Sequence, residues 1–201
     1  MDFFKSLKLK EDEREVEPAP ILRINGKPYA KMYHYCQAAP GEVSVLGRIR
    51  SDGDNVYTVL DVELLEQECS AASTDMDEQA LTDFVFKIAK RGGNPSEYNF
   101  WFHTHGHGGV FWSGVDDDNC ERHSQKTPYF ALVMNKCGEM VARRDFQGET
   151  CCAKVVVVPT GAPSLMKECY SEVRKKVRAI IPAFKEDEGN GFYKARRLNQ
   201  E

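Results

Sequence analysis

The stretch from Asn99 to Asp116 constrains this chain more than any other, because it joins an apolar segment, a glycine-rich turn and side chains that bind metals. Its first residues, 99–102, are mainly aromatic and follow Gly-Gly-Asn-Pro at 92–95. This pattern predicts a buried strand that runs out of a turn. Because a strand turns successive side chains to opposite faces, His103 and His105 point to the same side, where they can share one metal ion.

The second half of the stretch predicts a sharp turn followed by a helix. Gly106, Gly108 and Gly109 allow the turn, and Ser113-Gly-Val-Asp116 has the form of a helix capping box. The cap puts the Ser113 hydroxyl and the Asp116 carboxylate together at a helix N-terminus, which favours negative charge. Two histidines and a carboxylate that leave one position open are typical of a catalytic zinc site rather than a structural one.

Each part of this pattern also has an ordinary structural interpretation. Two histidines two residues apart often occur by chance at a strand end. A serine and an aspartate at this spacing form a helix cap without any metal. The metal interpretation depends on the four residues occurring together, because a helix cap does not ordinarily follow a paired-histidine strand across a glycine-rich turn.

Length and composition indicate one domain with short extensions. The chain has 201 residues and 41% hydrophobic content, enough to bury one good core. We place the domain at 21–184, with a closing strand and helix over 154–181. Residues 1–20 are rich in charge and end in Pro-Ala-Pro, which predicts a flexible N-terminal lead-in, and 185–201 form a polar C-terminal tail.

Charge and cysteine content argue against several classes of protein. The net charge is -4, from 27 basic and 31 acidic side chains, whereas a general nucleic-acid binder is clearly basic. With no signal peptide and no run of roughly 18 apolar residues, we expect a cytoplasmic protein without a membrane partner. The 7 cysteines are odd in number and contain no Cys-x-x-Cys pair, which argues against a disulfide framework or a cysteine zinc finger.

The remaining patterns predict strands interspersed with helices. Strands are expected over 21–24, 42–49, 56–65, 99–105, 129–135, 140–146 and 154–158, and helices over 31–39, 74–91, 113–123 and 164–181. Asn25-Gly26 predicts a turn after the first strand. This order indicates an α/β (α+β) fold, in which a mixed sheet is flanked by helices.

The spacing of the candidate ligands resembles the signature of the JAMM/MPN+ (JAB) zinc metalloproteases, a family that includes deubiquitinating isopeptidases. The match is His103-x-His105-x7-Ser113-x2-Asp116. The family also carries an upstream glutamate, and Glu42 stands in that place at the start of a predicted strand. The resemblance covers roughly residues 28–146 and is closest in character to the prokaryotic, deubiquitinase-like branch.

The resemblance implies a fold and a set of roles for these residues. The fold is a cytidine-deaminase-like MPN/JAMM domain, a mixed curved β-sheet flanked by helices. One Zn²⁺ is held by His103, His105 and Asp116, with water as the fourth ligand. Glu42 is the general base, and the Ser113 hydroxyl stabilises the oxyanion. The same resemblance leaves the neighbouring His107 outside the zinc shell.

The resemblance also implies a substrate. We expect hydrolysis of the bond after the C-terminal tail of a ubiquitin-like protein, in deconjugation or in precursor processing, with E1-like and E2-like proteins as further partners. One alternative is a JAMM-like peptidase or amidase that acts on an unrelated protein or on a cell-wall or phage substrate. Another is a catalytically silent MPN scaffold, although silent members usually lose ligands and this chain has all five positions.

Overall fold

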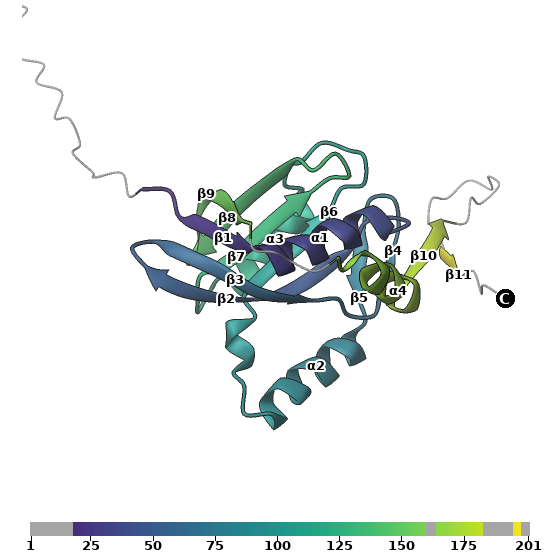
Figure 1. Cartoon of the computed structure of the whole chain (residues 1–201), viewed down its shortest axis with the longest axis horizontal. Helices are drawn as coiled ribbons and strands as arrows, with labels where there is room; N and C mark the ends of the chain where they lie inside the picture. The colour runs from purple at the N-terminus through teal and green to yellow at the C-terminus, as the bar shows by residue number, and fades with distance from the viewer. Residues whose placement is uncertain (1–17, 160–163, 183–194, 198–201) are drawn as a thin grey trace, which may run out of the picture.

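The computed structural model describes residues 18–159, 164–182 and 195–197 (Figure 1). Its helices are α1 (Gly26–Ala38), α2 (Glu78–Lys90), α3 (Gly114–His123) and α4 (Met166–Lys176), with a short 3-10 helix, η1 (Pro95–Glu97). Its strands are β1 (Ile21–Asn25), β2 (Ser44–Gly53), β3 (Val56–Glu63), β4 (Gln67–Cys69), β5 (Thr74–Met76), β6 (Phe100–Thr104), β7 (Tyr129–Met134), β8 (Met140–Phe146), β9 (Glu149–Val158), β10 (Val177–Pro182) and β11 (Ala195–Arg197).

Seven strands close into a barrel in the order β1-β3-β2-β6-β7-β8-β9. Strand β1 closes it, because it pairs in parallel with β3 on one side and with β9 on the other. The β6–β7 pair is also parallel, whereas the β2–β3, β2–β6, β7–β8 and β8–β9 pairs are antiparallel. A smaller sheet has the order β11-β10-β4-β5.

The closed barrel corrects the fold class expected from the sequence. A helix-flanked, mixed curved sheet of the cytidine-deaminase-like MPN/JAMM type is wrong, because the sheet has no open edge between β1 and β9. The pairing of β1 and the length of β9 both differ from the prediction. Ile21–Asn25 looks like one arm of a hairpin, but it pairs with β3 and β9. Strand β9 is also longer than expected, because it begins at Glu149 rather than at residue 154.

The barrel strands have two faces, which pack in different apolar clusters. On one face α1 packs with Phe100, Phe102, Phe130 and Leu132 in a large apolar cluster. On the other face α3 covers a smaller cluster of Cys120, Tyr129 and Ala131, against which Trp101 and Trp112 pack. Because side chains alternate along a strand, β6 contributes to both clusters, and the metal-binding candidates lie on the α3 face.

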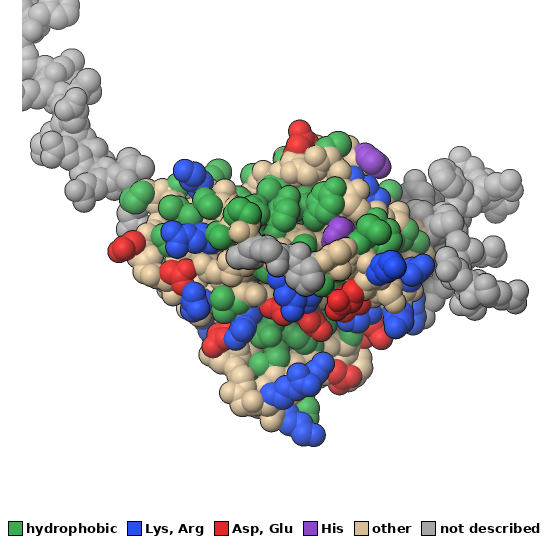
Figure 2. Space-filling view, viewed as in Figure 1, with side chains coloured by type: hydrophobic (Ala, Val, Ile, Leu, Met, Phe, Trp, Pro, Cys, Tyr) green, Lys and Arg blue, Asp and Glu red, His purple; other side chains and the backbone are tan. Residues whose placement is uncertain are grey.

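Helices α1 and α4 lie side by side and cover the end of the apolar cluster (Figure 1). They are joined by a hydrogen bond from the Tyr35 hydroxyl to the Glu172 carboxylate. Helix α2 instead projects from the barrel, and every residue in it keeps contact with solvent. The space-filling view shows Lys and Arg side chains around α4 and along the outer end of α2, interspersed with acidic ones (Figure 2).

Several element boundaries differ from the sequence prediction. Helix α1 follows β1 directly at Gly26, without the predicted turn. Thr74–Met76 is strand β5, which pairs with β4, and α2 begins only at Glu78, after the Asp77 side chain has capped it. The last part of the predicted closing helix is strand β10, in which β-branched Val177 and Ile180 favour extended backbone.

The predicted extensions lie largely outside the described residues. Of the lead-in at 1–20 only residues 18–20 are described, and of the tail at 185–201 only β11 is described. No helix among the described residues is long and apolar enough to cross a membrane. The strands at 42–49, 56–65, 99–105, 129–135 and 140–146 and the helix at 113–123 are confirmed to within a few residues.

Candidate metal centre

Strand β6 brings the two histidines together, as its alternating pattern predicts. Phe102 and Thr104 are buried on the α1 face, so His103 and His105 turn to the α3 face. Their Nε2 atoms lie 3.2 Å apart. His103 is 2% exposed, and its ring stacks on the Trp101 indole, with ring centroids 4.3 Å apart. Packing therefore fixes the direction in which its Nε2 atom points.

The first turn of α3 brings Asp116 to the same place. The capping box predicted from the sequence is confirmed: the backbone N–H and the hydroxyl of Ser113 both donate to Asp116 Oδ2, at 2.7 and 2.8 Å, and Asp116 N–H donates to Ser113 Oγ at 3.3 Å. These bonds occupy one carboxylate oxygen. The other, Oδ1, faces His103 Nε2 at 3.4 Å.

The three side chains fit a zinc ion. One ligand atom from each of His103, His105 and Asp116 lies within 4.8 Å of the other two. The His105 Nδ1 atom lies 2.9 Å from the carbonyl oxygen of Gly109, which can only accept, so Nδ1 carries the proton and Nε2 keeps its lone pair. Two imidazole nitrogens and a carboxylate oxygen are a donor set that zinc prefers, with room for a fourth ligand.

The charge states also suit a metal, which binds neutral imidazole and ionised carboxylate. Burial lowers the pKa of His103, and the neighbouring Asp116 carboxylate only partly opposes that shift. Burial alone would raise the pKa of Asp116, but hydrogen bonds with His103 and Ser113 outweigh it and lower this pKa to about 2. His103 Nδ1 is buried and finds no hydrogen-bond partner within the described residues, so stacking on Trp101 orients this ring.

Glu42 lies beside the same group because of the β2–β6 register. Ser44 is paired with His103, and Val43 continues the pairing by accepting a hydrogen bond from Thr104 N–H at 3.1 Å. The next step places Glu42 opposite His105, with its side chain on the same face. Burial raises the pKa of Glu42 to about 7, while His105 lowers it and Asp116 raises it. A cation bound between those ligands would lower it again.

Two further predictions concern Ser113 and His107. The Ser113 hydroxyl has one proton, which it donates to Asp116 Oδ2, so its observed role is to orient that carboxylate. Its role at an oxyanion stays a prediction. His107 is exposed and is not part of the group formed by His103, His105 and Asp116. Its exclusion from the zinc shell stays a prediction.

The buried amide of Gln67 supports the Glu42 segment through Ser44, a role that was not predicted from the sequence. Its Oε1 accepts from Ser44 N–H at 2.9 Å and from the Thr74 hydroxyl at 2.8 Å. Its Nε2 donates to the carbonyl oxygens of Ser44 and Leu65, at 2.9 and 3.0 Å. The Gln67 amide thus bonds to the main chain of Ser44 as a neighbouring strand would. Ser44 is the residue paired with His103 on β6. A single glutamine in a polar run gives no local signal of such a role.

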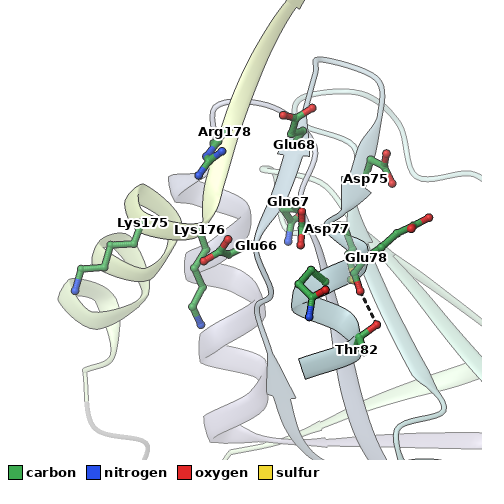
Figure 3. Close-up of a pocket in the computed structure, with 12 residues that line it drawn as sticks. Glu66, Gln67, Glu68, Asp75, Asp77, Glu78, Thr82, Lys175, Lys176 and Arg178 are labelled. Carbon is green, nitrogen blue, oxygen red and sulfur yellow. Dashed lines mark hydrogen bonds between the residues drawn. The ribbon is translucent and has the colours of Figure 1, made fainter. Parts of the chain in front are cut away.

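Gln67 also lines a separate, charged cleft (Figure 3). Carboxylates on or just before β4, β5 and α2 and cations of α4 and β10 line it. The charged lining residues are Glu66, Glu68, Asp75, Asp77, Glu78, Lys175, Lys176 and Arg178. None of the five signature residues is among the residues that line this cleft. The cleft is therefore distinct from the candidate metal centre.

Comparisons with known proteins bear on the fold alone. No protein-family model and no curated protein matches this chain. Among solved structures, the chain is similar to the solution structure of protein DSY2949 from Desulfitobacterium hafniense. The TM-score is 0.53 and the identity 19%, over 70% of this chain and 94% of that one.

Proposed function

We propose that this chain is a zinc-dependent peptidase that hydrolyses the peptide or isopeptide bond after the C-terminal tail of a ubiquitin-like protein. One observation carries the proposal: the ligand atoms of His103, His105 and Asp116 converge within 4.8 Å of one another, beside the Glu42 segment. Three protein ligands suit a catalytic rather than a structural zinc, because structural sites use four.

The chemistry divides between the metal and the side chains. Zinc bound there would supply Lewis-acid catalysis, since it lowers the pKa of water and polarises a carbonyl group. A Glu42 carboxylate oxygen would take the proton of the attacking water and deliver it to the leaving amine nitrogen. The Ser113 capping bonds would keep Asp116 ionised and directed at its place. By the resemblance, the Ser113 hydroxyl would also stabilise the oxyanion.

The substrate class rests on the five-residue signature rather than on a pocket. The signature resembles that of enzymes which cleave the bond after an extended C-terminal tail. Extended segments commonly bind by adding a strand to a sheet. E1-like and E2-like proteins of the same pathway are the partners we propose, in a cytoplasmic setting. A JAMM-like peptidase for another substrate and a silent scaffold are the competing outcomes.

The test is cleavage of a ubiquitin-like fusion by the full chain, with zinc content measured on the same sample. We expect about one zinc per chain, cleavage after the tail, loss of cleavage with a chelator and recovery when zinc is added back. Cleavage that persists with chelator, or a chain that binds no zinc, contradicts the proposal. Stoichiometric zinc without cleavage of any ubiquitin-like fusion favours a different substrate or the scaffold.

A further inference from the structure

Arg143 of β8 is a buried cation close to the candidate metal centre and outside the five-residue signature. Its side chain is 5% exposed. Burying a charge is costly unless it is paired and hydrogen-bonded. Here the guanidinium meets two carboxylates: it donates to Asp117 Oδ1, and its Nε lies 2.9 Å from Asp145 Oδ2. One hydrogen-bonded carboxylate and one further ion pair therefore hold the cation in place.

Two other contacts of the same guanidinium reach the groups that build the metal centre. Its Nη2 donates to the backbone carbonyl oxygen of Asp116 at 3.2 Å, so it contacts a candidate ligand without using the ligand's carboxylate. Its central carbon lies 4.5 Å from the centroid of the Trp112 ring, a cation–π geometry. Trp112 in turn meets the His103 ring edge-on, with centroids 6.0 Å apart.

We infer that Arg143 is a positioning residue of the metal centre, which fixes the first turn of α3 and the Trp112 indole so that Asp116 and His103 face each other. This inference rests on the metal centre proposed above. Ser113 holds Asp116 from the carboxylate side and Arg143 holds it from the main-chain side. Only a planar guanidinium with donors in several directions makes all these contacts, because the lysine ammonium acts as a point charge.

The test is the zinc dissociation constant of the full-length R143K variant, measured by competition with a chromophoric chelator. Loss of a group that orients a metal ligand typically weakens affinity about 10- to 100-fold, and we expect that range here. The matched control is R144K. Arg144 is the next residue of β8, where its side chain donates instead to Asn55 Oδ1 at 3.1 Å, so R144K should bind zinc as the natural sequence does.

Melting temperatures of the zinc-free proteins separate positioning from general stability. We expect R143K to lose more zinc affinity than R144K even at an equal melting temperature, and the Co²⁺-loaded R143K to show a shifted visible absorption spectrum. If R143K does not fold, D117N replaces it, because the Asp117 side chain is 62% exposed and its loss should be tolerated. D117N should weaken zinc binding in the same direction.

The outcomes distinguish this inference from the proposed function. If the unaltered chain binds zinc and R143K, or D117N where it replaces R143K, binds it equally well, Arg143 is not a positioning residue. The same follows if R144K weakens binding as much as R143K. If the unaltered chain binds zinc but cleaves no ubiquitin-like fusion, the proposed substrate is wrong while the role of Arg143 stands. If the unaltered chain binds no zinc, the proposed metal centre is wrong, and the inference about Arg143 is wrong with it.

Discussion

The two faces of strand β6 have different structural requirements. Phe100 and Phe102 are fully buried against α1, in a cluster where the requirement is volume and apolar surface. Trp101 and His103 face α3, where the requirement is the direction of a few polar atoms. One strand of five residues therefore contributes both to the apolar core of the barrel and, through His103, to the candidate site. Substitutions of neighbouring residues should separate the two properties.

The largest expected effect lies on the α3 face and leaves the packing of the α1 face intact. Glu42→Gln removes the proposed proton acceptor and keeps its size, so turnover on a ubiquitin-like fusion should fall about 10²–10⁴-fold. Zinc content should stay at that of the unaltered chain, because Glu42 is not one of the three ligands. Steady-state kinetics and metal analysis on the same sample check this. Undiminished turnover at equal zinc content would exclude Glu42 as the base.

The next prediction tests the α1 face. Phe102→Ala deletes a ring that is fully buried in the main apolar cluster, and such a deletion costs about 3–5 kcal/mol of unfolding free energy. Urea unfolding of the zinc-free chain measures that loss. The zinc dissociation constant of the folded fraction should change little. A large loss of zinc affinity together with little destabilisation would mean that the two faces are not separable in this way.

His103→Ala, one residue further along β6, should give the converse result. A structural zinc site with four ligands is worth roughly 10–16 kcal/mol, so one ligand accounts for about 2.5–4 kcal/mol, a loss of roughly 10²–10³-fold in affinity. Zinc should raise the melting temperature of the unaltered chain and leave that of H103A nearly unchanged. The matched control is His107→Ala, an exposed histidine of the same segment. Equal losses in the two variants would contradict the ligand assignment.

The parts that the sequence predicted correctly depend on local pattern. Alternation through 99–105 places His103 and His105 on one face, and the capping box places Ser113 beside Asp116. Both follow from periodicity and from contacts between residues close in sequence. The pairing of Glu42 with this group came only from the family resemblance, because the β2–β6 register that supports it joins distant segments.

The parts that failed depend on long-range pairing. Nothing in Ile21–Asn25 alone shows that it pairs with both β3 and β9, so barrel closure was missed. Strand β10 pairs in parallel with β4, which overrides the helical pattern that continues from α4. Arg143 and Gln67 were missed for the same reason, since a lone arginine or glutamine reveals its partners only when the chain has folded.

The smallest expected effect comes from Ser113, which links the helix cap to the metal centre. Ser113→Ala removes the hydroxyl that accepts from Asp116 N–H and donates to Asp116 Oδ2. Loss of a cap costs about 0.5–2 kcal/mol of unfolding free energy, and loss of a bond that orients a ligand should weaken zinc binding about tenfold. Ser113→Thr keeps the hydroxyl and should restore both. Urea unfolding and chelator competition measure the two effects.

Ser113→Ala also distinguishes between two roles of the Ser113 hydroxyl proton. If the Ser113 hydroxyl serves Asp116, Ser113→Ala loses zinc affinity, and turnover recovers when zinc is raised to saturation. If it serves the oxyanion, zinc affinity stays near that of the unaltered chain while turnover at saturating zinc falls about 10²–10³-fold, as for other oxyanion donors. Because the hydroxyl already donates to Asp116 Oδ2 at 2.8 Å, we expect the first result. The second would require this bond to break during the reaction.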